Sequence, residues 1–256
     1  MTGGMRRPFR VFGEIRRLLD LTAGDMPLRR VTLSESMTDY WHERAKVDFG
    51  LERRKARIAR RMEAVADEIQ DGESVLELGC GSGDLLDVIR RRRPRCRIRG
   101  VDLSQEALDA ARARGFDVER ADLMAMGPDD LDSADVVVLS EVLEHLPDPE
   151  RVMSICRNIA SRRIIVTIPN VAFFLHRIRL GLFGKFPVTT VFHIREHLSL
   201  WSVKDFEFWA GALGLEVVSQ RSLGGVGAFG LQERWPNLFA NQVLFVLRRR
   251  DTEVGA

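Results

Sequence analysis

The sequence predicts an α/β protein with a mostly parallel sheet covered by helices on both faces. Three observations support this fold class. Short apolar runs alternate with helical segments along most of the chain. The first of these runs leads through a glycine-rich turn directly into a helix, as strands do in doubly wound sheets. A chain of 256 residues suffices for one large domain of this kind and leaves little for a second.

The predicted elements begin with a long helical segment. Residues 36–69 contain no proline and carry apolar residues at three- and four-residue spacing, which predicts helix up to Asp71-Gly72. We expect strands at 74–78, 96–102, 116–121, 134–140, 163–169, 215–222 and 242–248. We expect helices at 84–92, 104–114, 149–160 and 203–213.

Residues 1–35 form a basic extension that precedes the predicted domain. Within it, Val11 to Leu21 places apolar residues at helical spacing with arginine on the opposite side. This favours a helix in weak contact with a membrane surface, a short helix packed over the domain, or a poorly ordered extension. The domain itself is expected at 36–250, and residues 251–256 form a tail.

A second segment does not fit a simple alternation of strands and helices. Residues from about 171 to 202 are rich in Phe, Leu, Arg and His and are too long for an ordinary connection. We interpret them as an insertion in the domain.

Composition narrows the class of protein. Hydrophobic residues make up 45% and charged residues 30% of the chain, which is typical of globular domains. The net charge is only +2, although 35 of the 39 basic residues are arginine. Cys80, Cys96 and Cys156 are widely spaced, which argues against a disulfide framework or structural zinc and favours a cytoplasmic protein. No apolar run approaches the roughly 20 residues that span a bilayer.

The most informative segment is Glu77-Leu-Gly-Cys-Gly-Ser-Gly83. Its alternating glycines permit positive φ and let a ligand approach the backbone. Asp102 ends the next predicted strand, 19 residues beyond Gly83, where a carboxylate can bind a ribose diol. Position 84 is Asp, so the Gly-x-Gly-x-x-Gly fingerprint of nicotinamide and flavin sites is not met.

Together with Ala121-Asp122-Leu123 and Asp135 to Glu141, these motifs resemble those of class I S-adenosylmethionine-dependent methyltransferases. The resemblance extends from about Tyr40 to about Leu247. It implies a Rossmann-like fold with a seven-stranded, mostly parallel sheet whose last strand is antiparallel. It also implies S-adenosylmethionine as cofactor and a substrate lid at the insertion. Tyr40 to Ala45 resembles the segment that crosses the cofactor site in many of these enzymes.

The resemblance assigns cofactor contacts residue by residue. It implies backbone contacts at the turn, Glu77 near the amino end of the cofactor, and Asp102 on both ribose hydroxyls. Asp122 would accept a hydrogen bond from the adenine amino group. Glu77 is alternatively a cap of the glycine turn, and Asp122 a turn-former. The complete expected set is Glu77, Gly79, Cys80, Gly81, Gly83, Asp102, Leu103, Asp122, Leu123 and Ser140.

On the acceptor side, Glu141-Val-Leu-Glu144-His145 resembles a triplet in two groups of enzymes. These are ubiquinone-type O-methyltransferases and enzymes that methylate the terminal 2′-hydroxyl of small RNAs, and both hold a divalent metal with it. Such an ion suits carboxylate and imidazole ligands and lowers the pKa of a bound hydroxyl. The resemblance therefore implies a metal at Glu141, Glu144 and His145. In metal-free relatives the same residues simply begin a helix.

The segments around Asn170 and His197 are similar to a bacterial branch of these enzymes in which a histidine sits over the active site. This resemblance implies His197 as general base, with a histidine bonded to the lid backbone as the alternative. The catalytic candidates are His197, His145 and Glu141. We expect Asn170 to reach the same site and interpret His193 and His176 as structural or solvent-facing.

The expected reaction is O-methylation of a small-molecule, glycan or lipid-like acceptor. The phenylalanines of the insertion suggest an acceptor with an apolar part, or they pack the lid onto the sheet. The basic run from Arg90 to Arg99 lies at the end of the strands away from the expected site. No RNA-binding module is recognisable, and both observations argue against a nucleic-acid acceptor.

A second resemblance gives an alternative. Arg163 to Val171 and the following residues to Thr189 resemble the MetW family of methionine biosynthesis. That family implies a non-catalytic partner of an acyltransferase. The Glu-x-x-Glu-His triplet and the N-terminal extension depart from its pattern and favour a working methyltransferase.

Overall fold

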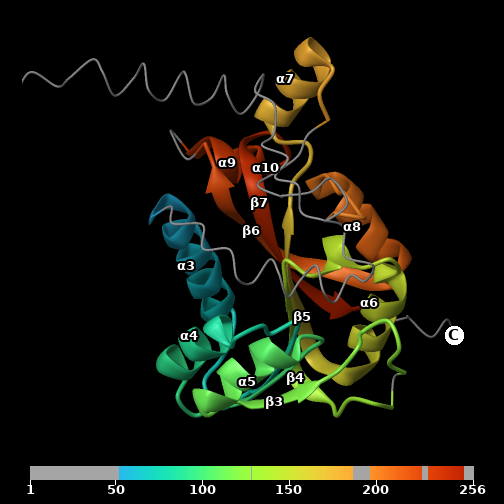
Figure 1. Cartoon of the computed structure of the whole chain (residues 1–256). Helices are drawn as coiled ribbons and strands as arrows, with labels where there is room; N and C mark the ends of the chain where they lie inside the picture. The colour runs from blue at the N-terminus through green and yellow to red at the C-terminus, as the bar shows by residue number, and fades with distance from the viewer. Residues whose placement is uncertain (1–51, 128, 187–196, 227–229, 251–256) are drawn as a thin grey trace, which may run out of the picture.

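The computed structural model describes residues 52–127, 129–186, 197–226 and 230–250. They form one seven-stranded sheet in the order β3-β2-β1-β4-β5-β7-β6 (Figure 1). The strands are β1 (Ser74–Leu78), β2 (Arg97–Asp102), β3 (Asp117–Arg120), β4 (Ala134–Ser140), β5 (Ala160–Pro169), β6 (Leu215–Gly225) and β7 (Ala240–Arg249).

Strand direction confirms the predicted topology. Strands β1 to β5 pair in parallel, whereas β7 pairs antiparallel with both β5 and β6. The order reverses between β1 and β4, because the chain runs outward to β3 and then returns to the other side of β1. In such sheets, ligands bind beyond the carboxyl ends of the strands at this switch point.

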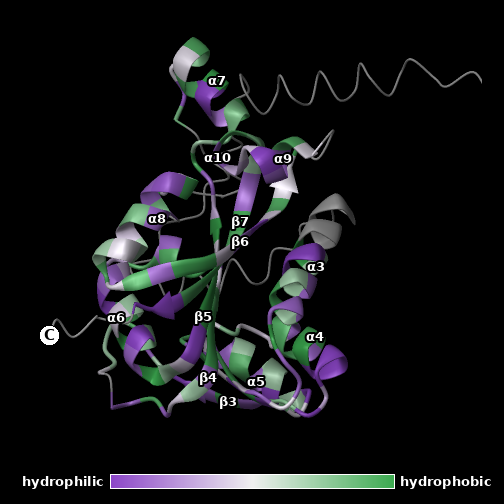
Figure 2. Ribbon diagram, turned by 180° about the vertical axis from the view of Figure 1, so that it is seen from behind, coloured by the Kyte–Doolittle hydropathy of each residue, from purple (hydrophilic) through white to green (hydrophobic). Residues whose placement is uncertain are grey.

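Helices cover both faces of the sheet (Figure 1). One face carries α3 (Glu52–Asp67), α4 (Asp84–Arg92) and α5 (Gln105–Ala113), and the other carries α6 (Pro149–Ile159) and α8 (Val203–Ala212). The side-chain alternation of the strands sets this arrangement. Val75 packs toward α3 and α4, whereas its neighbour Leu76 packs toward α6 and α8. Figure 2 shows the resulting hydrophobic strands at the centre of the sheet.

Local signals explain where the helices begin. The Ser104 hydroxyl accepts a hydrogen bond from the Ala107 amide at the start of α5, and Asp148 caps α6. Ser202 and Asp205 form a capping box at α8. The predicted strands, and the predicted helices from residue 84 onward, are found within three residues of their expected ends. Helix α3 ends at Asp67, close to the expected end at residue 69, whereas residues 36–51 of that predicted helix lie outside the described residues. β5 starts earlier than expected, at Ala160, because that residue pairs with Ala134 across a bulge.

The insertion contains a helix that the sequence did not predict, α7 (Phe174–Phe183), which ends at Gly184 with φ 61°. Two further short helices, α9 (Leu231–Arg234) and α10 (Pro236–Phe239), precede β7. All three lie toward one end of the sheet (Figures 1 and 2). Several predictions lie outside the described residues: the extension 1–35, the segment from Tyr40, His193 and the tail 251–256.

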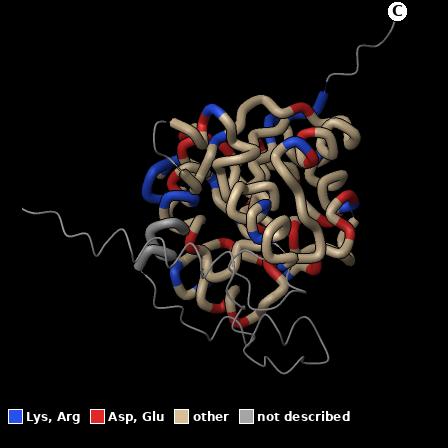
Figure 3. Tube along the Cα trace, turned by 90° about the horizontal axis from the view of Figure 1, so that it is seen from above, with Lys and Arg blue, Asp and Glu red and all other residues tan. Residues whose placement is uncertain are grey.

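Charged residues of both signs are interspersed around the outside of the described trace (Figure 3). Several arginines of the basic run pair with nearby carboxylates: Arg90 with Asp87, Arg92 with Glu63 and Asp67, Arg95 with Asp71, and Arg99 with Asp132. Among the described helices, none is both long and apolar enough to span a membrane.

Candidate functional site

The carboxyl ends of the central strands place polar side chains on the sheet face that α3 covers. Glu77 pairs in register with Gly100 on one side and Val138 on the other. Since Val138 packs toward α3 and α4, Glu77 also lies on that face. Ser140 and Thr167 follow on β4 and β5, and their hydroxyl oxygens lie 3.3 Å apart. The switch point is thus lined by acids and hydroxyls.

The glycine turn after β1 has the left-handed backbone that its sequence requires. Gly79, Gly81 and Gly83 have φ values of 76°, 53° and 80°. A Cβ on Gly79 would lie 2.7 Å from a methyl group of Val142, whereas one on Gly81 would meet nothing within 4 Å. The turn is therefore closely packed at Gly79 and open at Gly81, where a ligand could approach the backbone.

Cys80 turns its side chain away from this opening. Its thiol is buried in a cluster with Leu86 and Phe116, and Gly100 makes room for it. Burial, and to a smaller degree the charges of Glu77 and Asp102, raise the pKa of the Cys80 thiol. A ligand at the turn would consequently meet the Cys80 backbone and not its sulfur.

The Asp102 carboxylate is held in a fixed orientation at the end of β2. Its Oδ2 accepts a hydrogen bond from the Gly81 amide at 2.8 Å, and its Oδ1 accepts one from the Ser104 amide at 2.9 Å. A carboxylate has lone pairs for about two acceptances per oxygen, so each oxygen can still receive a hydroxyl. This arrangement suits a diol presented beside the glycine turn.

Asp122 follows β3 in the adjacent loop, whose Ala121 amide donates to the Asp102 carbonyl oxygen. One oxygen of the exposed Asp122 carboxylate accepts a hydrogen bond from the Met124 amide at 2.9 Å. The Asp122 side chain therefore stabilises the turn, which is the alternative role that the sequence suggests for it. The second carboxylate oxygen has no partner among the described residues. Leu103 and Leu123, which directly follow Asp102 and Asp122 in the sequence, are both partly buried.

Glu77 is the most unusual group at the end of β1. It is 3% exposed, and its Oε2 has no hydrogen-bond partner. Burial raises the pKa of Glu77 well above its ordinary value; the charge of Arg61 opposes this, and Asp102 and Asp84 add to it. Buried carboxylates without partners are rare because desolvation is costly. The group fits a cationic or hydrogen-bond-donating ligand.

Glu141 begins the loop after β4 in a strained conformation. Among the described residues it is the one non-glycine with positive φ, at 60°. The Thr167 hydroxyl donates to its Oε1 at 3.3 Å, and the Arg61 guanidinium lies 3.6 Å from its Oε2. These contacts direct Glu141 toward α3.

The next acid, Glu144, lies in a short 3-10 helix (Leu143–His145) and forms a different group. It is 0% exposed, and both carboxylate oxygens lack a hydrogen-bond partner. His145 Nε2 lies 3.8 Å from Glu144 Oε1, and the rings of His145 and His197 are 4.9 Å apart. Glu144, His145 and His197 offer ligand atoms within 4.8 Å of one another.

Backbone pairing brings His197 to this group. The amides of Leu198 and Ser199 donate to the Glu144 carbonyl oxygen, so the end of the insertion lies against the loop after β4. Burial raises the pKa of Glu144, and the nearby Glu141 charge raises it further. A buried carboxylate with two imidazoles suits a divalent ion. The structure therefore groups His197 with Glu144 and His145, whereas the set predicted from the sequence contains Glu141 as its third member.

Two other residues take structural positions. Asn170 is fully buried, and its Nδ2 donates to backbone carbonyls of Asn237 and Ala240, so the expectation that it reaches the site is wrong. His176 packs against Phe173, and burial, together with the Arg179 charge, lowers its pKa to about 4. Its imidazole is consequently neutral at ordinary pH.

Sequence reasoning missed Arg61. It extends from α3 into the group of acids, and its charge acts on both Glu77 and Glu144. In a chain with 35 arginines, no spacing or motif distinguishes this one. Only the packing of α3 on the sheet reveals it.

Comparison with known proteins places this site in context. The profile of a family described as "Methionine biosynthesis protein MetW" matches residues 59–247. The Ubiquinone biosynthesis O-methyltransferase of Hahella chejuensis (strain KCTC 2396) is 34% identical over 95 residues, 35% of this chain and 39% of that protein. The Bifunctional methionine biosynthesis protein MetXA/MetW of Rhodopirellula baltica is 34% identical over 119 residues, 43% of this chain and 19% of that protein. The matches thus span less than two fifths of these relatives.

Among solved structures, the magnesium protoporphyrin IX methyltransferase (ChlM) from Synechocystis PCC 6803 with bound SAH has a similar fold. The TM-score is 0.55 at 18% identity, over 82% of this chain and 93% of that one. The likeness and the strand order together confirm the class I methyltransferase fold.

Proposed function

The chain belongs to the MetW family, and on this premise we propose that it binds S-adenosylmethionine and transfers the methyl group to an acceptor hydroxyl. The acceptor would be a small molecule, a glycan or a lipid-like compound. The observation that carries the cofactor half of this proposal is the buried Glu77 carboxylate beside the open glycine turn, whose Oε2 has no hydrogen-bond partner.

The residues at the turn fit the cofactor's chemistry. Its cationic amino end would supply the partner that Glu77 lacks, and its ribose hydroxyls match the fixed Asp102 carboxylate. The ChlM structure, which contains SAH, supports this choice of ligand. The remaining proposed contacts are the backbone of Gly79, Cys80, Gly81 and Gly83, the side chains of Leu103 and Leu123, and the polar groups of Asp122 and Ser140.

The group formed by Glu144, His145 and His197 fits a divalent metal. Glu144 is buried with both oxygens unpartnered, which is the arrangement that a bound cation would complete. A metal bound there would lower the pKa of an acceptor hydroxyl. The geometry favours the ligand set Glu144, His145 and His197 over the set Glu141, Glu144 and His145.

This chain's own residues would align the acceptor and accept its proton. Methyl transfer is an in-line displacement, so orientation of the nucleophile is the main requirement. The imidazoles of His145 and His197 lie beside each other, and an imidazole that does not ligate the metal can accept the hydroxyl proton. Glu141 is fixed by Thr167 at the end of β4, next to the place where the methyl group would emerge.

The described part of the insertion supports an acceptor with an apolar portion. Leu180, Leu182, Phe183 and Phe186 are exposed on or just after α7. By contrast, several arginines of the basic run already pair with carboxylates, which favours such an acceptor over nucleic acid.

Isothermal titration with S-adenosylhomocysteine tests the cofactor half of the proposal. We expect micromolar binding by the full chain and a loss of at least about tenfold in Asp102→Ala, because two charge-assisted hydrogen bonds disappear. Asp109→Ala, an exposed change on α5, serves as the control. The absence of binding by the unaltered chain would contradict the proposal.

The acceptor half is tested by transfer of labelled methyl from S-adenosylmethionine to 3,4-dihydroxybenzoate, octyl glucoside and a short RNA. Each reaction is run without metal and with Mg²⁺, Mn²⁺ or Zn²⁺. Transfer to a hydroxyl of either small molecule, dependent on His197 and His145, would support the assignment.

A second candidate function rests on the family match itself. The bifunctional MetXA/MetW protein joins a MetW-like part to another part in one chain. It supports the alternative of a non-catalytic partner of an acyltransferase in methionine biosynthesis. Co-purification with such an enzyme, together with no methyl transfer to any acceptor, would favour this alternative.

A further inference from the structure

One glutamine, Gln242, lies buried near the start of β7, on the sheet face that carries the proposed active site. We propose that its side-chain amide binds a second hydroxyl of the acceptor, at the end away from the hydroxyl that receives the methyl group. The inference rests on the proposed methyl transfer and deepens it, because it names the acceptor class as a compound with two separated hydroxyls.

Strand register fixes the face on which Gln242 lies. Gln242 pairs with Pro169 at the end of β5, and the next pair on this face joins Leu244 to Thr167. Leu244 packs toward α3, and residues two apart on a strand share a face. Gln242 therefore lies on the same face as Thr167 and, one strand further, Ser140.

The amide of Gln242 is buried without a partner. The residue is 6% exposed, and its Oε1 accepts no hydrogen bond from the part of the chain that the structure describes. Its neighbours on β5 and β6, Pro169 and Gly224, carry no side chain that can hydrogen-bond. Burying such a group unpartnered costs free energy, so an apolar residue would be favoured here unless a ligand completes the amide.

The hydroxyls nearer the centre of the sheet are already partnered. The Ser140 and Thr167 oxygens lie 3.3 Å apart, and the Thr167 hydroxyl donates to Glu141. Glu141 lies next to the place where the methyl group would emerge under the proposed function. Since β7 is two strands away from β4, a ligand that reaches from Glu141 to Gln242 would span about 10 Å.

The chemistry of the amide selects the group that it binds. An amide oxygen accepts hydrogen bonds and carries no net charge, so it suits a neutral donor such as a hydroxyl. An ether at the same place would accept hydrogen bonds only and could not complete Oε1. The acceptor thus carries one hydroxyl that receives the methyl group and a second that donates to Gln242.

The test compares three rigid phenols by isothermal titration of the full chain saturated with S-adenosylhomocysteine. The diol 4,4′-dihydroxybiphenyl has a hydroxyl at each end, 4-hydroxybiphenyl lacks the second, and 4-hydroxy-4′-methoxybiphenyl replaces it with an ether. We expect the unaltered chain to bind the diol about 5- to 20-fold more tightly than the other two, as one hydrogen bond to a buried group predicts. Gln242→Met should bind all three within about twofold of one another, because it removes that hydrogen bond. Gln220→Met, an exposed change on β6, should keep the preference.

A stability measurement separates a binding role from a structural one. Methionine is unbranched like glutamine, fills irregular gaps and needs no hydrogen bond. The urea midpoint of Gln242→Met without ligand should therefore equal or exceed that of the unaltered chain. A lower midpoint would show that the amide stabilises the fold, and it would overturn the inference.

Two binding results would also overturn the inference. One is the absence of a preference for the diol in the unaltered chain, including a failure to bind any of the three phenols. The other is a preference that Gln242→Met retains. Both leave the binding of S-adenosylhomocysteine intact, whereas failure of the unaltered chain to bind S-adenosylhomocysteine would overturn the cofactor proposal and this inference with it.

Discussion

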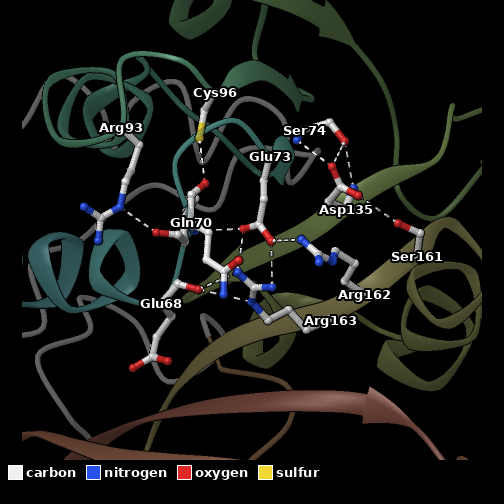
Figure 4. Close-up of polar contacts among 11 residues, drawn as sticks. Glu68, Gln70, Glu73, Ser74, Arg93, Cys96, Asp135, Ser161, Arg162 and Arg163 are labelled. Carbon is white, nitrogen blue, oxygen red and sulfur yellow. Dashed lines mark hydrogen bonds and ion pairs between the residues drawn. The ribbon is translucent and has the colours of Figure 1, made fainter.

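Glu73 at the amino end of the sheet and Glu77 and Glu144 at its carboxyl end are equally buried but differently partnered. Their exposures are 4%, 3% and 0%. Glu73 accepts hydrogen bonds from Arg162, Arg163 and the Gln70 amide (Figure 4). Neither Glu77 nor Glu144 has a full set of partners. The pKa values differ accordingly: burial would raise that of Glu73, but hydrogen bonds from Arg163 and Gln70 lower it.

The contrast shows what each end of the sheet does. Around Glu73, further bonds join the start of β1 to β4 and β5, such as those of Asp135 with Ser74 and Ser161 (Figure 4). This end is a completed polar network that holds the fold together. A native protein leaves buried carboxylates unpaired only where something else completes them. The carboxyl end is therefore where we place the ligands.

The largest expected effect is at the completed end. Glu73→Ala should destabilise the protein by about 3–5 kcal/mol, because it leaves the largely buried Arg163 without its carboxylate partner. Urea unfolding measures this free energy. Glu119→Ala, an exposed change on β3, should alter it by less than about 0.5 kcal/mol. Similar values for the two variants would contradict the structural role of Glu73.

Gly100→Ala should cost about 1–3 kcal/mol, because its Cβ would lie 2.7 Å from that of Cys80. This variant tests whether the thiol side of the glycine turn belongs to the core. Gly181→Ala on α7 is the matched control, since nothing lies within 4 Å of its Cβ. The control should be neutral or slightly stabilising. Equal stabilities in urea would place Cys80 outside the core.

The contributions of Glu77 and Glu144 to stability should change with pH in the opposite direction from that of Glu73. The raised pKa of Glu77 and Glu144 means that their protonated forms favour the folded state. That contribution is complete below pH 4.5 and is lost as the pH rises through the folded-state pKa. Glu144→Gln should therefore raise stability at pH 8 by about 1–2 kcal/mol and less at pH 5.

For Glu73 the pKa is lowered, so its contribution is present above pH 4.5 and is lost as the pH falls. Glu73→Gln should consequently lower stability most at neutral pH. Thermal unfolding of both variants between pH 5 and pH 8 measures the two trends. If pH changed the stability of both variants in the same direction, burial alone, and not the hydrogen-bond partners, would determine how these residues respond to pH.

Much of the fold and half of the site could be predicted from the sequence. Strand periodicity and the glycine turn predict the sheet, and strand ends predict where Glu77 and Asp102 lie. The rest depends on tertiary contacts. Arg61 reaches the site only because α3 packs on the sheet, and His197 reaches Glu144 only because the insertion's backbone pairs with the loop after β4. Neither contact has a local signature.

A smaller effect concerns the proposed metal group. Mn²⁺ should raise the unfolding temperature of the unaltered chain, because a ligand that binds the folded state stabilises it. His197→Ala should reduce this shift, and Glu141→Gln should reduce it less, since Glu141 is directed toward Arg61. If Glu141→Gln reduced the shift of the unfolding temperature more than His197→Ala, the result would support the ligand set that the sequence predicts, Glu141, Glu144 and His145.

The most direct test of the contrast is thermal unfolding of Glu77→Gln and Glu73→Gln with and without S-adenosylhomocysteine. At about 100 times its dissociation constant, the ligand should stabilise the unaltered chain and Glu73→Gln by about 2.7 kcal/mol. For Glu77→Gln, the gain should fall to about 1 kcal/mol or less, because the ligand's ammonium loses its anionic partner. Equal stabilisation of both variants would contradict the claim that the unpaired carboxylates mark the ligand site.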